Sequence, residues 1–183
     1  MEEPFANTTT LMNAAKRARL ENRPSDAHRD YAAAVELCRN SGSRRELVLA
    51  LKGLGQIERD AGNGEAALRL YEEAAAVCRE EGDQLALAHT VRHIADIHLY
   101  ARRAELAGPC YVEAIAIYRA NPNTKPLDLA NALRPFAILN EDMGKVAEAR
   151  RLWAEARDLY ATAGVPQGVA EGSRRLARLN ATS

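Results

Sequence analysis

The chain repeats a short pattern of small and aromatic residues four times, and this repetition limits the folds open to it. In each copy an alanine is followed by an aromatic residue four positions later and by a second alanine three positions after that. This spacing puts the three side chains on one face of a helix. The four copies are Ala27/Tyr31/Ala34, Ala67/Tyr71/Ala74, Ala107/Tyr111/Ala114 and Ala149/Trp153/Ala156, so the aromatics lie 40, 40 and 42 residues apart.

A second helical pattern precedes each copy, with apolar or small residues at spacings that again fit one helix face. Short turns join the two patterns, and three of the four turns contain Gly or Pro, which commonly end helices. A lone helical hairpin cannot bury its apolar stripe, whereas a stack of hairpins can. The sequence therefore predicts stacked hairpins. Their first-helix packing positions are Leu11/Ala14/Ala15/Ala18, Leu51/Leu54/Gly55/Glu58, Val91/Ile94/Ala95/His98 and Leu133/Phe136/Ala137/Asn140.

A ninth helical segment follows Pro166 and has no partner after it. Its three arginines suit the polar end cap of a repeat array. We expect its packing face to run through Ser173, Leu176 and Ala177.

The chain resembles the tetratricopeptide repeat family, in the long-period variety of 40 to 42 residues found in kinesin light chains and many bacterial proteins. The small–aromatic–alanine signature of the second helix is intact in all four copies, and the Leu-Gly pair of the first helix survives as Leu54-Gly55. The leading Trp of the 34-residue consensus is missing. The resemblance implies a single all-α domain over residues 1–183, a right-handed α-solenoid of four helix-turn-helix repeats (about 8–40, 44–81, 84–121 and 126–163) and a capping helix at about 166–180.

Charge and composition exclude several classes of function. The 25 basic and 25 acidic residues cancel, which argues against general attraction to nucleic acid or to acidic membranes. Three cysteines without metal-ligand spacing, no apolar run of about 18 residues and no signal-like segment lead us to expect a cytoplasmic protein. No catalytic or phosphate-binding motif occurs. We therefore expect no enzyme activity, no cofactor and no metal site.

Cations recur at the repeat interval on the first helices, at Lys52, Arg92, Arg134 and Arg174. The family resemblance implies that these positions face the concave groove. A row of guanidinium groups favours carboxylates through paired hydrogen bonds and a focused field. We therefore expect an adaptor that binds an acidic peptide or protein segment. The residues expected to contact the partner are Lys52, Gln56, Arg59, His89, Arg92, Asn131, Arg134, Arg174 and Arg178.

Two other functions stay open at this point. Stacked hairpins have open ends, and the first repeat, the weakest copy, could pair with another chain to give a self-assembling scaffold. RNA binding is compatible with the cations but lacks groove-facing aromatics for base stacking. His89, His93 and Asp96 share a helix face, yet three ligands within two turns suit a tetrahedral metal poorly. We interpret them as polar groove residues.

Overall fold

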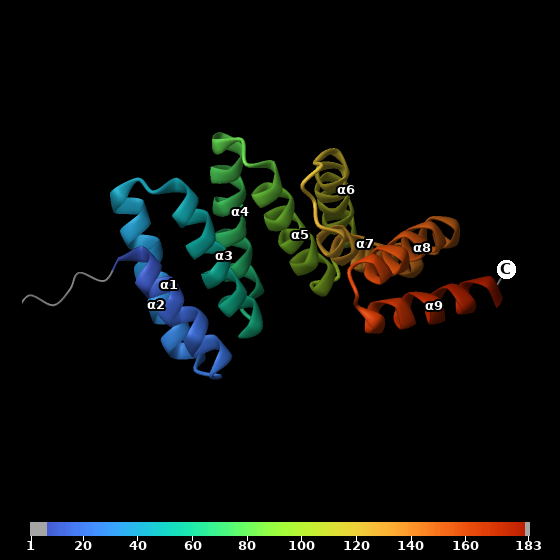
Figure 1. The fold of residues 1–183 in the computed structure, drawn as a ribbon, viewed down its shortest axis with the longest axis horizontal. Coiled ribbons are helices and arrows are strands. Elements are labelled where there is room, and N and C mark those ends of the chain that lie inside the picture. The colour runs from blue at the N-terminus through green and yellow to red at the C-terminus, as the bar shows by residue number, and fades with distance from the viewer. Residues whose placement is uncertain (1–6, 182–183) are drawn as a thin grey trace, which may run out of the picture. The chain divides into compact units, whose positions relative to one another are not determined.

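The structure is a computed structural model that describes residues 7–181; residues 1–6 and 182–183 of the expected domain lie outside this range. Within it the chain forms nine α-helices and no strand (Figure 1). The all-α helical-repeat class predicted from the sequence is confirmed. The helices are α1 (Thr8–Leu20), α2 (Pro24–Ser41), α3 (Arg44–Asp60), α4 (Gly64–Glu81), α5 (Gln84–Tyr100), α6 (Ala104–Ala120), α7 (Pro126–Asp142), α8 (Val146–Thr162) and α9 (Pro166–Ala181).

The chain divides into two compact units, and α5 passes from one to the other. Unit 1 ends at Thr90 and unit 2 begins at Val91. In unit 1, α1 packs on α2, α2 on α3 and α3 on α4; in unit 2, α6 packs on α7, α7 on α8 and α8 on α9. Each of these helices thus contacts its neighbours in the sequence, which is the packing expected of stacked hairpins.

The two helices of each hairpin are joined by the same kind of tight turn. In unit 1, Asn22 and Gly62 have φ angles of 55° and 83°, and in unit 2, Arg102 and Gly144 have φ angles of 58° and 71°. Glycine adopts this left-handed region freely, whereas an arginine there costs about 1–2 kcal/mol. Helix packing therefore imposes the turn even where the residue is unfavourable.

The aromatic rings of the repeat signature form the core, as predicted. Their exposed fractions lie between 0% and 5%, and the eight alanines of the signature are fully buried. Burying a ring of this size contributes several kcal/mol to stability, and its truncation to alanine costs about 3–5 kcal/mol. The four rings are those of Tyr31, Tyr71, Tyr111 and Trp153.

In unit 1 the rings fit against glycines of α3. A Cβ atom built on Gly55 would lie 3.0 Å from the ring of Tyr71, and one built on Gly53 would overlap the ring of Tyr31. The missing side chains therefore leave the space that the rings occupy. The Leu-Gly pair of the family pattern thus has a packing cause in this chain.

Ion pairs also connect second helices of successive hairpins within each unit. Arg39 of α2 contacts Glu73 of α4 at 2.7 Å, and Arg119 of α6 contacts Glu155 of α8 at 2.6 Å. The two arginines occupy equivalent repeat positions, and so do the two glutamates. The repeat therefore carries an electrostatic contact between hairpins in addition to its apolar core.

The packing face predicted for α9 is wrong. Ser173 and Ala177 are exposed, whereas Gly168, Gly172 and Leu179 are buried. The reason is again the space required by a neighbouring side chain: a Cβ atom on Gly168 would overlap the ring of Tyr160 on α8. Small residues rather than apolar ones therefore set the face that α9 turns to α8.

The ring-against-glycine packing predicts unequal effects of the same substitution at two sites. We expect Gly53→Ala to lower the free energy of unfolding by about 1–3 kcal/mol, because the added methyl group forces the Tyr31 ring to move. Gly108 lies inside α6, and apart from its chain neighbours no heavy atom lies within 4 Å of an added Cβ. Gly108→Ala should therefore change the free energy of unfolding much less, because the gain in helix propensity is offset by the contact of the new methyl group with the ring of Pro109.

Urea denaturation followed by circular dichroism measures both variants. Equal effects of the two substitutions would contradict this account of the core.

Candidate functional site

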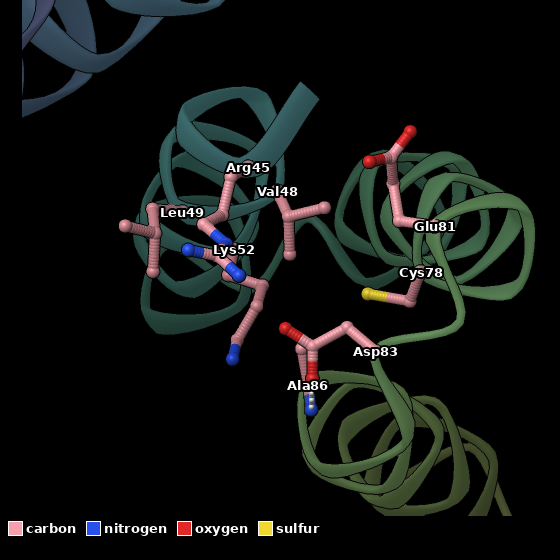
Figure 2. A pocket seen from close by; sticks show the side chains of 8 residues that line it. All are labelled: Arg45, Val48, Leu49, Lys52, Cys78, Glu81, Asp83 and Ala86. Atoms are coloured by element: carbon pink, nitrogen blue, oxygen red, sulfur yellow. Dashed lines mark hydrogen bonds between the residues drawn. The ribbon is translucent and has the colours of Figure 1, made fainter. Parts of the chain in front are cut away.

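Lys52, the first cation of the predicted row, lines a pocket in unit 1. Successive turns of α3 place Arg45, Val48, Leu49 and Lys52 on one helix face. The pocket has a volume of about 290 Å³. Figure 2 shows the α3 side chains on one side of the pocket and the last turn of α4 on the other. The remaining lining residues are Cys78, Glu81, Asp83 and Ala86.

The walls of this pocket combine apolar surface with charges of both signs. Val48 and Cys78 are buried, whereas Leu49 is an exposed leucine at the edge. Burial raises the pKa of the Cys78 thiol. A thiol that stays protonated is a poor nucleophile, so Cys78 serves the pocket as an apolar group.

The carboxylates opposite α3 have structural partners of their own. Asp83 Oδ1 accepts a hydrogen bond of 3.0 Å from the backbone N–H of Ala86, which caps the first turn of α5. Glu81 Oε1 lies 3.4 Å from Nε of Arg44. Both carboxylates therefore have contacts elsewhere in the protein. Arg45 and Lys52 stand on the α3 side of the pocket.

Gln56 and Arg59 lie further along α3, in a chain of hydrogen bonds that reaches α1. Arg59 Nη2 donates to Gln56 Oε1 at 2.8 Å, and Gln56 Nε2 donates to Asp60 Oδ1 at 2.5 Å. Arg19 of α1 contacts the other oxygen of Asp60 at 3.1 Å. His89, the remaining predicted residue of unit 1, is half-buried on α5.

In unit 2, Arg92 belongs to a largely buried polar cluster. Its Nη1 donates to Asp96 Oδ2 at 2.9 Å, and its Nη2 lies 2.9 Å from His93 Nε2. The hydroxyl of Tyr111 donates to Asp96 Oδ1 at 2.7 Å, and burial raises the pKa of this hydroxyl. We interpreted Asp96 from the sequence as a polar groove residue. In the structure it accepts a hydrogen bond from a tyrosine of the core.

Arg134, the third member of the row, holds the cap. Its Nε and Nη2 donate to the two carboxylate oxygens of Glu171 on α9, at 2.7 and 2.9 Å. Such a paired contact fixes both distance and orientation. Arg134 therefore connects α7 to α9.

Arg178 makes a second connection between the same two helices, to Glu141 of α7. The side chain of Glu141 is only 8% exposed; it also contacts Arg175 at 3.2 Å and accepts a hydrogen bond from the indole N–H of Trp153. Arg175 in turn lies over the Trp153 ring, 5.4 Å from its centroid. Three side chains from α8 and α9 thus meet at the carboxylate of Glu141 on α7.

Asn131 and Arg174 are the last two residues predicted to contact the partner, and their surroundings differ. Asn131 Oδ1 accepts a hydrogen bond of 3.0 Å from the hydroxyl of Tyr160, so it joins α7 to α8. Arg174 is exposed on α9. Sequence reasoning missed Arg45, Glu171 and the contacts that Glu141 makes. The repeat register gave no sign of these contacts, because each glutamate belongs to a single copy.

The pair between Arg134 and Glu171 predicts a pH-dependent contribution to stability. The hydrogen bonds from Arg134 hold the pKa of Glu171 below its ordinary value. The pair therefore stabilises the fold above the unfolded-state pKa of about 4.3, and this contribution is lost as the pH falls through the lower folded-state pKa.

We expect Glu171→Gln to reduce the free energy of unfolding by about 1 kcal/mol at neutral pH. The difference from the wild type should shrink as the pH is lowered from about 5 towards 2. Chemical denaturation at several pH values measures it, with Glu72→Gln on the exposed face of α4 as the matched control. A difference that persists undiminished in acid would contradict the assigned pair.

No helix in the described part of the chain is both long and apolar enough to cross a membrane. No protein of curated function matches the chain in sequence. Residues 45–123 match the model of the tetratricopeptide repeat family.

Several solved structures share the fold. The apo form of RapI matches with a TM-score of 0.85 and 11% identity, over 94% of this chain and 62% of that one, so the chain spans less than two thirds of RapI. A putative kinesin light chain with nearly identical repeats, from Podosopora anserina, matches with a TM-score of 0.73 and 13% identity, over 98% and 96% of the two chains. BtubC (BKLC) from P. vanneervenii matches with a TM-score of 0.58 and 16% identity, over 96% and 90%.

Proteins of this family are generally interaction modules without catalytic activity. Residues 45–123 thus match tetratricopeptide repeats, and the chain shares the helical-repeat fold of the solved structures.

Proposed function

We propose that the chain is a cytoplasmic adaptor that binds an acidic segment of a partner protein and performs no chemistry of its own. In this proposal the contact centres on the pocket of unit 1. A carboxylate of the partner lies against Arg45 and Lys52, and a neighbouring aliphatic side chain of the partner enters the pocket. The observation that carries the proposal is that two cations of α3 line one side of a partly apolar concavity of about 290 Å³, while Glu81 and Asp83 opposite have contacts with Arg44 and the backbone of Ala86.

The size and lining of the pocket favour this mode of binding. Ligand sites are commonly concave and apolar with a few placed polar groups, and the polar groups fix orientation. Val48, Cys78 and Ala86 offer apolar surface to a side chain of the partner, while Lys52 stands at the same wall. A segment that pairs an acidic residue with Leu, Ile or Val fits both features.

The arginines near α9 are less suited to be the main anchor. An acidic partner that reached Arg134 or Arg178 would have to replace Glu171 or Glu141, and one carboxylate would be exchanged for another. The gain in free energy from such an exchange is small. We therefore assign the other predicted residues a secondary role, in which they hold the helices in place or add weak attraction to the partner. These residues are Arg92, Asn131, Arg134, Arg174 and Arg178.

Gln56, Arg59 and His89 extend the site beyond the pocket. Gln56 and Arg59 already form a hydrogen-bonded chain on α3, so their donors are held in place. Preorganised polar groups of this kind give directional contacts to a peptide backbone at little entropic cost. They would set the register of the bound segment, while Arg45 and Lys52 supply the attraction.

The test is selection from a random peptide library displayed on phage, followed by affinity measurement with a selected peptide. We expect the selected sequences to place Asp or Glu beside an aliphatic residue. Lys52→Glu should weaken binding by about tenfold or more, because it repels the acidic residue at the centre of the site. Lys145→Glu, the same change in an exposed turn of unit 2, is the matched control and should bind as the wild type does.

A second variant separates the pocket from its charge. Ala86→Leu fills part of the pocket without altering any charge, and we expect it to reduce affinity by about tenfold. Circular dichroism checks that both variants keep their helices. Selected peptides without acidic residues, or binding that survives both Lys52→Glu and Ala86→Leu, would contradict the proposed site.

A further inference from the structure

The pocket of unit 1 has a counterpart in unit 2 that a tyrosine ring fills. Tyr160 of α8 is 4% exposed, and its ring lies against Gly168 of α9. Its hydroxyl donates to Asn131 of α7 at 3.0 Å. Burial raises the pKa of this hydroxyl, and the positive charge of Arg134 acts in the opposite direction, which places Arg134 near it. The ring therefore occupies a space between α8 and α9, and its oxygen lies at the side of α7.

These four residues correspond one by one to residues that line the pocket of unit 1. Each of them lies 82 residues beyond its counterpart, which is two repeats further along the chain. The counterpart of Tyr160 is Cys78, so a much smaller side chain stands where unit 2 has a ring. The counterparts of Asn131, Arg134 and Gly168 are Leu49, Lys52 and Ala86.

The intervening repeat also carries a tyrosine at this position. Tyr118 of α6 lies 40 residues beyond Cys78 and is 1% exposed. Its hydroxyl accepts a hydrogen bond from Arg92, which lies 40 residues beyond Lys52. In both later repeats a ring thus extends from the second helix towards the cation of the first helix. The pocket of unit 1 keeps the cation and lacks the ring, and it has a volume of about 290 Å³.

We propose that this pocket binds a small aromatic carboxylate, whose ring takes the place of the missing tyrosine ring and whose carboxylate lies at Lys52. Tyr160 indicates the direction of the ligand, because its ring lies inside and its oxygen lies at the positions that correspond to Leu49 and Lys52. An anionic oxygen at that place meets the ammonium group of Lys52. Arg45 stands on the same side of the pocket and adds to the attraction.

The lining of the pocket suits an aromatic ring. A cavity that remains where a large side chain is absent binds a small molecule of similar shape. Val48 and Cys78 are buried, and the sulfur of Cys78 points from α4 towards the side chains of α3 (Figure 2). Sulfur makes favourable contacts with the edges of aromatic rings. The ring therefore has apolar contacts inside the pocket, while the carboxylate stays at the cationic side.

A bound aromatic acid would occupy the place assigned above to the aliphatic side chain of the partner. Where the proposed function holds, the acid therefore competes with the partner segment and regulates its binding. The small-molecule site itself does not depend on the segment, because it follows from the tyrosines at the corresponding positions of the later repeats.

Titration of the isotope-labelled full chain with benzoate tests the site, with amide chemical shifts as the readout and ionic strength held constant. We expect saturable shifts around Val48, Lys52, Cys78 and Ala86, with a dissociation constant of about 1 mM or lower for a ligand of this size. Benzamide has the ring without the charge and should bind about tenfold more weakly. Acetate has the charge without the ring and should cause no saturable shifts at these residues.

Two variants separate the ring from the charge. Cys78→Tyr combined with Ala86→Gly reproduces the pair formed by Tyr160 and Gly168, so the chain's own ring fills the pocket and benzoate binding should be lost. Lys52→Gln leaves the cavity open and should weaken benzoate by about tenfold, to the affinity of benzamide. Lys145→Gln, the same change in an exposed turn of unit 2, is the matched control and should bind benzoate as the wild type does.

Circular dichroism and urea denaturation check that each variant keeps its fold. The absence of saturable benzoate shifts at the pocket would overturn the proposal. Benzoate affinity that is unchanged in the folded double variant, or in Lys52→Gln, would overturn it as well. No peptide enters this experiment, so its outcome is separate from that of the proposed function. An acidic peptide that binds at the pocket when benzoate does not would leave the adaptor in place and remove the small-molecule site.

Discussion

The contact between an aromatic ring and a small residue of a neighbouring helix determines how these helices stack. Tyr31 and Tyr71 each lie against a glycine of α3, and Tyr160 lies against Gly168 of α9. A ring can lie this close to a helix backbone only where the facing residue has no side chain, so the small residue is as necessary as the ring. The many alanines of the signature serve the same purpose by letting helices approach closely.

The sequence predicts the parts of the structure that recur and misses the parts that occur once. The helical class and the four buried aromatics follow from periodicity, because a face that must be buried in every copy leaves the same mark in each. The prediction for the packing face of α9 is wrong because two glycines, Gly168 and Gly172, help to form this face and glycine carries no hydrophobic signal. The carboxylates of Glu141 and Glu171 likewise have no counterpart in the other repeats. Side-chain pairing of this kind depends on three-dimensional proximity, which spacing alone does not specify.

Several arginines in this chain hold helices together. Arg39 and Arg119 connect successive second helices, and Arg134 and Arg178 fasten α9 to α7. Each of these arginines contacts a glutamate, and the chain as a whole carries equal numbers of basic and acidic residues. A charge-reversal experiment at Arg134 would therefore report on the attachment of α9 as well as on any partner. Lys52 and Arg45 differ because they line a concavity, and for this reason the proposed site lies on α3.

The most direct test of this assignment is to map where an acidic peptide binds. We suggest titrating isotope-labelled protein with a short blocked peptide of alternating Glu and Leu and recording amide chemical shifts, which detect even millimolar binding. If the acidic segment binds at the pocket of unit 1, we expect the largest changes in amide chemical shift between Arg45 and Lys52 and around Asp83 and Ala86, and no change in α9. The same peptide with Gln in place of Glu should produce much smaller shifts. Shifts centred on Arg134, Arg174 and Arg178 would contradict the account, since they would place the acidic partner on the cap and not on α3.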